Sequence, residues 1–223
     1  MPPVRIYIES GDTRSFASAA DWPGWARSGK TEAAAITALL DYAPRYAAVV
    51  AGRSTGFRTP TAVEVVERVR GGSGTDFGAP NYRYKPDATP ITGSALKRHV
   101  AALGACWAAF AATATSAVGH ELRRGPRGGG RDLAKIITHV LEAEVAYVTG
   151  LGGKPVLEGA DALADLERVH EVFLTTLQGR RDGSIPAVGP RGGARWQPRF
   201  ALRYTAWHAL DHAWEIEDRL LPA

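Results

Sequence analysis

Residues 203–219 read RYTAWHALDHAWEIEDR and carry the clearest functional pattern in the chain. Apolar residues recur there at helical spacing, which predicts an amphipathic helix. His208 and His212 are four residues apart, so a helix places both imidazoles on one face, beside its apolar stripe. Neutral imidazoles in that arrangement can bind one cation, but core histidines satisfied by a carbonyl or an acid show the same spacing. The pair alone leaves both interpretations open.

A third histidine lies on another predicted helix, at residues 131–148. Apolar residues mark one face of this helix, and His139 lies on the border of that face. Glu142 follows one turn later and could orient an imidazole, although a solvated glutamate fits equally well. A further predicted helix at residues 160–177 carries His170, which competes with His139 for the place of third ligand.

Composition restricts the kinds of site that the chain can build. The chain has 223 residues, of which 45% are hydrophobic, so it can form one large domain or two small ones. Cys106 is the only cysteine, which excludes internal disulfides and thiolate-rich zinc sites. Any metal must therefore be bound by histidine and carboxylate side chains.

Hydropathy and charge indicate the compartment and the partners. No apolar run approaches the about 18 residues of a membrane helix, and the first residues lack the apolar stretch of a signal peptide. We therefore expect a cytoplasmic protein without a membrane partner. The net charge of +4 is spread over both parts of the chain, and glycine and proline interrupt the arginines of residues 123–131. This pattern is typical of a solvated loop, so we do not expect nucleic acid as a partner.

The N-terminal part combines strand and helix patterns. Strict alternation of apolar and polar residues predicts a strand at residues 4–9, and a second strand at residues 15–19 completes a β-hairpin. A helix is predicted at residues 32–42 with Thr31 as its N-cap, and residues 61–70 form a later strand. The fold class of this part is α+β.

Residues 24–31 fit G-x-x-x-x-G-K-T, the pattern of the phosphate-binding Walker loop. A working loop of this kind follows a buried strand and precedes a helix within a parallel α/β sheet. Here the preceding residues are Ala-Asp-Trp-Pro, and no series of alternating strands and helices follows. We expect a turn and a helix cap rather than a nucleotide site.

Residues 71–93 are rich in glycine and proline and read as a connection, which places a domain boundary near residue 92. We therefore expect one domain at residues 1–92 and a second at residues 93–223. The second domain contains four amphipathic helical segments, and we expect an all-α four-helix bundle. The helix with His139 should run from about Arg131 to Val148, with Asp132 in its first turn and Gly150 closing it.

The first domain resembles the HicB-like antitoxin domain over residues 3–70. The resemblance rests on the order strand, turn, strand, followed by DWPGWARSGKTEAAA at residues 21–35 and a helix. Members of that family are small α+β domains that bind a toxin which cleaves RNA. The resemblance implies a fold and, as one option, a module that binds a protein or RNA.

The second domain resembles the DinB-like, or YfiT-like, superfamily over residues 92–220. The resemblance rests on RDLAKIITHVLEAE at residues 131–144 and on residues 204–219. It selects His139, His208 and His212 as ligands of a divalent metal, commonly zinc or nickel, inside a four-helix bundle. Characterised relatives include transferases and isomerases that use a low-molecular-weight thiol such as mycothiol, bacillithiol or glutathione.

Three imidazoles leave an open position on a divalent ion, which is typical of reactive rather than structural zinc sites. We therefore expect a transferase or isomerase that uses a metal-bound thiol on a small electrophilic substrate. The alternatives are a hydrolase or lyase that uses metal-bound water, and a non-enzymatic binding module with a structural bundle. A homodimer is left open, and no catalytic residue is assigned.

Four further side chains are candidates for contacts around the metal or the substrate. Asp211 lies between the two histidines of the C-terminal helix and could accept a hydrogen bond from a ligand. Arg203 and Tyr204 lie about one turn before the first of these histidines and could contact an anionic ligand. Glu142 is the fourth candidate, and each of the four could instead have a packing or surface role.

Overall fold

The computed structural model describes residues 3–53, 55–91, 93–124 and 130–221. The chain folds into two compact units. Unit 1 contains Met1–Cys106 and Leu202–Trp207, and unit 2 contains Trp107–Ala201 and His208–Ala223. These units differ from the expected domains 1–92 and 93–223, because the first residues of one long helix and a middle segment of another belong to unit 1.

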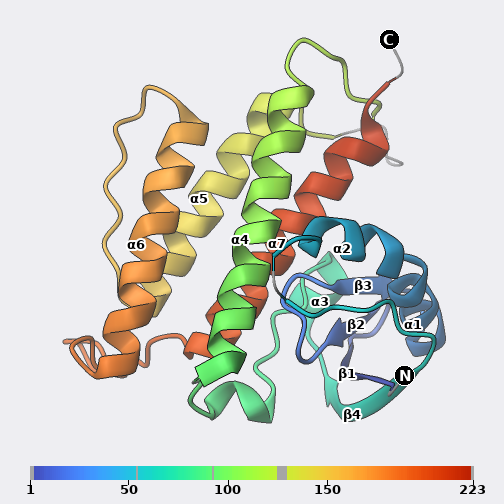
Figure 1. Ribbon diagram of the computed structural model, residues 1–223, viewed down its shortest axis with the longest axis horizontal. Coiled ribbons are helices and arrows are strands. Elements are labelled where there is room, and N and C mark those ends of the chain that lie inside the picture. Colours follow the sequence, from blue (N-terminus) through green and yellow to red (C-terminus); the bar gives the residue numbers. More distant parts are fainter. Residues whose placement is uncertain (1–2, 54, 92, 125–129, 222–223) are drawn as a thin grey trace. The chain divides into compact units, whose positions relative to one another are not determined.

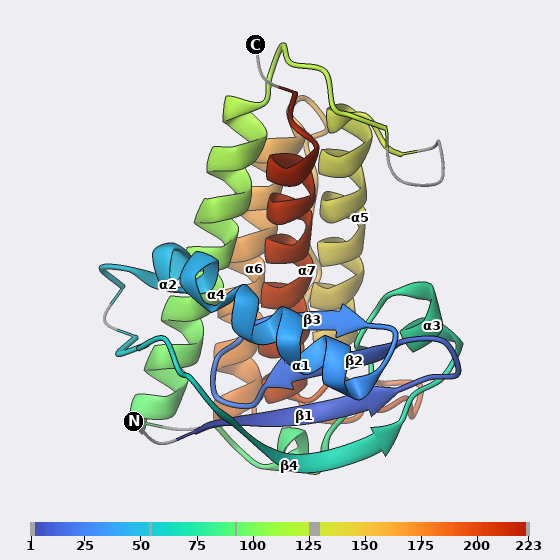
Figure 2. The same ribbon diagram turned by 90° about the vertical axis from the view of Figure 1, so that its right-hand side faces the viewer.

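Unit 1 is built on a four-stranded sheet with the order β3-β2-β1-β4. Its strands are β1 (Val4–Ser10), β2 (Ser15–Ala19), β3 (Ala26–Gly29) and β4 (Val63–Arg70). The predicted hairpin is confirmed, since β1 and β2 pair antiparallel with Ile6 opposite Ala19. The pairing of β4 with β1 is parallel and contains a register shift between Ile6 and Tyr7. Figure 2 shows the four strands one above another in this order, with β3 uppermost and β4 lowest.

Unit 1 also contains short helices, and the first of them lies close to its predicted position. They are α1 (Glu32–Asp41), α2 (Ala43–Val50), the short α3 (Ser73–Phe77) and a 3-10 turn at Lys85–Ala88. Thr31 caps α1 as expected, because its hydroxyl accepts a hydrogen bond from the backbone N–H of Ala34. Helix α1 packs on β2 and β3. Helix α3 and the 3-10 turn lie within the connection expected at residues 71–93. That segment therefore contains more regular structure than its composition suggests.

The Walker-like residues 24–31 do not form a phosphate-binding loop between a strand and a helix. Residues 26–29 are strand β3, which pairs antiparallel with β2. A side chain at Gly29 would come within 2.5 Å of the backbone nitrogen of Ala35, so glycine is required there by close packing against α1. The strand itself was not predicted, because only four residues carry it and they lack an apolar alternation.

Four long helices make up most of the remaining chain (Figure 1). They are α4 (Gly93–Ser116), α5 (Leu133–Leu151), α6 (Ala162–Asp182) and α7 (Pro198–Arg219). Within unit 2, α5 packs against α6. The molecule is thus a sheet with helices followed by mainly helical structure, which confirms the coarse fold class.

Helix α5 illustrates how local signals set the ends of these helices. Asp132 is its N-cap, and the Asp132 carboxylate accepts a hydrogen bond of 2.8 Å from the backbone N–H of Lys135. The expected end at Gly150 is wrong, since the helix continues to Leu151 and Gly152 ends it with a φ of 114°. Gly150 serves packing instead, because a side chain there would come within 3.0 Å of the Trp196 ring.

Candidate metal centre

Two helices of unit 2 bring three histidines together. His139 lies in the second turn of α5, and His208 and His212 lie on successive turns of α7. One ligand atom from each imidazole can be chosen so that all three lie within 4.8 Å of one another. Among the described residues, this trio of histidines could hold a metal ion, as the sequence predicted.

The distance between two of these ligand atoms fits a metal site. His208 Nε2 lies 3.3 Å from His139 Nε2. Two nitrogen ligands at about 2.0–2.1 Å from a zinc ion, at the tetrahedral angle of about 109°, are about 3.3–3.4 Å apart. The two imidazoles therefore already have the separation that a shared ion requires, and a ligand atom of His212 lies within 4.8 Å of both.

Burial keeps the imidazoles in the form that binds a metal. His208 is 6% exposed. Burial, followed by the charges of His212 and His139, holds the pKa of His208 well below its usual value. Burial, followed by His212 and Arg131, also lowers the pKa of His139. Both rings are neutral at pH 7, and neutral rings offer a lone pair to a cation.

Glu215 orients the third histidine, although it was not among the predicted site residues. His212 Nδ1 lies 2.7 Å from Glu215 Oε2, and Arg219 Nη1 donates to the other carboxylate oxygen at 2.5 Å. Burial alone would raise the pKa of Glu215, but the bonds from His212 and Arg219 hold it below its ordinary value. With Nδ1 bound to Glu215, Nε2 of His212 is left for a cation. The spacing of three residues on a helix was the signal available in the sequence.

Aromatic rings border the histidines on the side of His208. The Tyr147 ring lies 5.4 Å from the His208 ring, edge to face. Trp196 stacks on Tyr147 at 5.2 Å, and Phe200 packs against Trp196 at 4.8 Å. We call Tyr147, Trp196 and Phe200 the aromatic wall. It gives this side of the site an apolar surface.

The opposite end of the site carries positive charge. A cavity of about 340 Å³ in unit 2 is lined by Arg124, Arg131 and Arg219, together with Asp132 and other residues. Arg219 connects this basic cavity to the histidines, because it bonds to Glu215, the partner of His212. The charge of Arg131 also reaches the histidines, since it contributes to the lowered pKa values of both His139 and His208.

Two of the four additional candidates, Glu142 and Asp211, belong to unit 2 together with the histidines. Glu142 is exposed on α5, and its charge acts to raise the pKa of His139. Asp211 is half-buried on α7, next in sequence to His212. These positions do not test the roles proposed for Glu142 and Asp211 from the sequence, and both roles stay predictions.

The other two candidates, Arg203 and Tyr204, belong to unit 1. The Arg203 guanidinium donates to the Asp87 carboxylate at 2.7 Å and to the Tyr82 carbonyl at 2.9 Å. Its Cζ atom also lies 4.6 Å from the centre of the Tyr84 ring. The Tyr204 ring packs 5.4 Å from that of Trp207. These bonds bind the buried Arg203 side chain to residues that precede α4.

The competing histidine, His170, has different neighbours from the trio. Its Nε2 lies 2.9 Å from the Glu144 carboxylate, and its ring stacks on Trp107 at 3.8 Å. The remaining histidines are equally separate. His99 Nδ1 contacts the Ala95 carbonyl at 2.7 Å, one turn earlier on α4, and His120 is exposed.

Comparisons with protein-family models, with curated proteins and with solved structures find no match for this chain. No helix in the described part of the chain has the length and hydropathy needed to cross a membrane.

Proposed function

We propose that His139, His208 and His212 hold a divalent ion, zinc or nickel, and that the protein is a metal-dependent transferase or isomerase. Its second reactant is a low-molecular-weight thiol, and its substrate is a small electrophile. The observation that carries this proposal is the convergence of three histidine ligand atoms within 4.8 Å, two of them at the spacing of ligands on one ion. Three protein ligands leave a position for a reactant, whereas structural zinc sites normally use four.

A bound divalent ion would supply Lewis acidity and would favour the thiolate form of a thiol at neutral pH. The protein's own residues prepare this chemistry. Burial keeps His139 and His208 neutral, so they bind a cation without first losing a proton. Glu215 accepts the Nδ1 proton of His212 and thereby fixes which nitrogen faces the site.

The surroundings of the histidines support two different reactants. The aromatic wall offers an apolar surface on which an uncharged electrophile can pack. The basic cavity, with Arg124, Arg131 and Arg219, suits the carboxylates that low-molecular-weight thiols such as glutathione carry. A site with one apolar and one cationic side can bind the two reactants in a fixed order and orientation.

The proposal extends to the fold. Helices α4–α7 and the three histidines correspond to what the resemblance to the DinB-like superfamily implies, so we propose a four-helix bundle of that kind. The hairpin, β4 and α1 of unit 1 likewise support a HicB-like α+β domain.

The test has two stages. The protein is purified without chelators or a histidine tag, and its metal content is measured by elemental analysis; we expect one zinc or nickel ion per chain. Consumption of a model electrophile such as 1-chloro-2,4-dinitrobenzene is then measured with and without metal, and with glutathione, bacillithiol or mycothiol. Turnover that requires both metal and one thiol supports the proposal. A protein without stoichiometric metal would overturn it at the first stage.

The two alternatives give different results in the same experiment. A metal-dependent hydrolase or lyase converts its substrate without any thiol. A binding module retains its partner, a protein or RNA, after His208→Ala removes the metal. Either result would replace the thiol-dependent activity as the function.

The basic cavity provides a separate check on the thiol. Arg131→Gln should raise the KM for the thiol by about tenfold and leave the KM for the electrophile unchanged, because one charge-assisted bond to a carboxylate is lost. Arg181→Gln is the control, since Arg181 is an exposed arginine on α6 that bonds to Gln178. Equal effects of the two substitutions would show that the cavity does not bind the thiol.

A further inference from the structure

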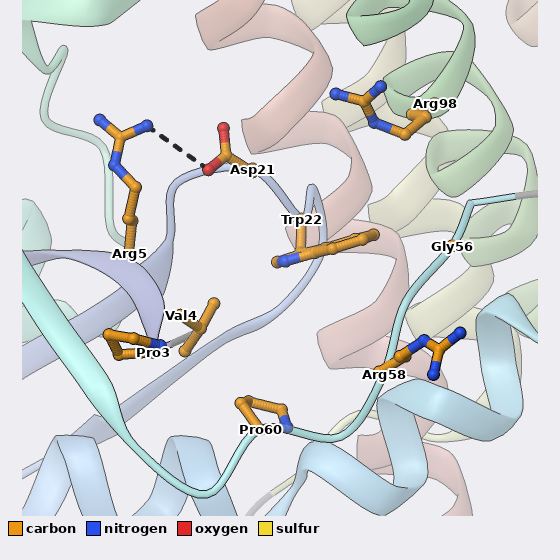
Figure 3. Close-up of a pocket in the computed structure, with 9 residues that line it drawn as sticks. All are labelled: Pro3, Val4, Arg5, Asp21, Trp22, Gly56, Arg58, Pro60 and Arg98. Carbon is orange, nitrogen blue, oxygen red and sulfur yellow. Dashed lines mark ion pairs between the residues drawn. The ribbon is translucent and has the colours of Figure 1, made fainter. Parts of the chain in front are cut away.

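Unit 1 contains a cavity of about 680 Å³ that the proposed function does not use (Figure 3). Its lining comes from four segments of the chain: the start of β1, the turn after β2, residues 56–60 before β4, and the first turns of α4. Its volume lies within the range of about 300–1,000 Å³ that is typical of small-molecule sites.

The cavity has an excess of positive charge. Arg5, Arg58 and Arg98 line it, with Asp21 as the one acidic residue of the lining. Arg5 pairs with Asp21 at 3.6 Å, but both side chains are about half exposed, at 53% and 49%, so the pair is weak. Within the described part of the chain, the guanidinium groups of Arg58 and Arg98 form no ion pair and no hydrogen bond. Two guanidinium groups that never lose their charge are therefore available to an anion.

A planar aromatic surface lies between these two arginines. Figure 3 shows the Trp22 ring with Arg98 on one side and Arg58 on the other. The ring is half-buried, and Phe57 packs against it edge to face at 5.0 Å, which fixes its orientation. Pro3, Val4 and Pro60 extend the apolar part of the lining. The cavity thus combines a rigid stacking surface with two guanidinium groups.

We propose that this cavity binds a small molecule in which a phosphate or carboxylate is joined to a planar ring, such as a nucleoside monophosphate. The ring stacks on Trp22, a contact that does not depend on the identity of the base. The anionic group bonds to Arg58 or Arg98, depending on the side of the Trp22 ring on which the ligand stacks, because one guanidinium can donate two parallel N–H bonds to a phosphate or carboxylate. This site is distinct from the Walker-like residues 24–31, which form β3 and the cap of α1.

Isothermal titration calorimetry of the full chain tests the proposal with four compounds: AMP, phenyl phosphate, adenosine and inorganic phosphate. We expect AMP and phenyl phosphate to bind at least about tenfold more tightly than adenosine or inorganic phosphate, because only they combine ring and charge. The proposal would be overturned if neither AMP nor phenyl phosphate showed saturable binding. It would also be overturned if inorganic phosphate bound as tightly as AMP.

Substitutions then assign the contacts. Arg58→Gln or Arg98→Gln, whichever lies on the side where the ring stacks, should weaken AMP binding by about tenfold, whereas Arg53→Gln, an exposed arginine just before the segment that lines the cavity, should not. Trp22→Phe keeps a smaller ring and should reduce the preference for AMP over inorganic phosphate, with circular dichroism as the check on folding. Equal weakening by Arg53→Gln would refute the assigned contacts. Tighter binding of a single-stranded oligoribonucleotide than of AMP would show a macromolecular ligand instead.

His139→Ala separates this proposal from the proposed function. AMP binding should be the same in this variant as in the parent chain, since the cavity uses residues of unit 1 alone. Loss of AMP binding together with the metal would show that the two ligands share one site.

Discussion

Two histidine clusters of unit 2 have opposite chemical surroundings. In the first, the Nε2 atoms of His139 and His208 lie 3.3 Å apart and face each other. In the second, His170 faces Glu144, a residue that is 1% exposed and whose carboxylate also accepts a hydrogen bond of 3.2 Å from Trp107 Nε1. Both clusters are largely buried on amphipathic helices, and the neighbours of the imidazoles distinguish them.

The difference shows what a buried histidine needs in order to be stable. Glu144 supplies His170 with an acid at ion-pair distance, 2.9 Å, although the contact lacks the direction of a hydrogen bond. That cluster is electrostatically complete without a ligand. The Nε2 atoms of His139 and His208 can share one proton in a hydrogen bond, or both can bind a cation. The first cluster can therefore take up an ion in place of that proton, whereas the second already contains an acid.

The largest expected effect is on metal content. His139→Ala, His208→Ala and His212→Ala should each reduce bound metal from about one ion per chain to almost none, because one of three protein ligands is lost. Native mass spectrometry measures the stoichiometry directly. His170→Ala and His120→Ala serve as controls and should keep the metal. If His170→Ala also loses it, the distinction between the two clusters is wrong.

A smaller effect is expected at the carboxylate that supports the metal site. Glu215→Gln should weaken metal binding by about 10–100-fold, because the amide is a poorer acceptor for the Nδ1 proton of His212. Competition with a chelator of known affinity measures the change. Glu217→Gln, two residues further along α7, is the matched control. Unchanged affinity in Glu215→Gln would assign the Glu215 carboxylate to Arg219 alone.

A substitution in the second cluster, Glu144→Ala, should lower the stability of the fold and leave the metal content unchanged. Glu144→Ala leaves the buried Trp107 N–H and His170 without their carboxylate, so the free energy of unfolding should fall by about 1–3 kcal/mol. Urea denaturation measures this loss, and elemental analysis should find the metal content unchanged. Glu144→Gln retains an oxygen for Trp107 and should lose less. A variant that unfolds normally but contains no metal would contradict the separation of the clusters.

The smallest effect concerns pH in the metal-free protein. The pKa values of His139 and His208 are lowered in the folded state, so the unfolded chain takes up protons first, near its pKa of about 6.5. Their contribution to stability is complete above that pH and is lost as the pH falls toward the folded pKa values. Urea denaturation between pH 7.5 and about 5 should show decreasing stability, and His139→Ala should flatten this dependence. An equally steep dependence in His139→Ala would assign the effect to other groups.

Local patterns in the sequence predicted the elements that carry the site. The four-residue spacing of His208 and His212 placed them on one face of α7, because a helix repeats every 3.6 residues. The sequence placed Asp132 in the first turn of α5, one position from its observed place as the N-cap. The hairpin of β1 and β2 followed in the same way from alternation and a short turn. Each of these features depends on residues close together in the chain.

Contacts between residues that are far apart in the chain could not be predicted from such local patterns. Strand β3 is too short to show a period, and the parallel pairing of β4 with β1 joins segments that are far apart in sequence. Arg203 is next to the predicted site in sequence, yet its bonds are with Asp87 and Tyr82 in unit 1. Helical periodicity gives the direction of a side chain and does not identify what that side chain meets.

The sequence by itself determined which histidines could serve as ligands: spacing alone gave the pair on one helix and either His139 or His170 as the third. Only the tertiary structure decided that His139 meets the pair, since it lies 69 residues from His208 in the chain. It also placed Glu144 against His170 and so left that histidine with an acid. The physical reason is that a ligand set requires atoms within a few ångströms, and the packing of α5 against its neighbours sets those distances.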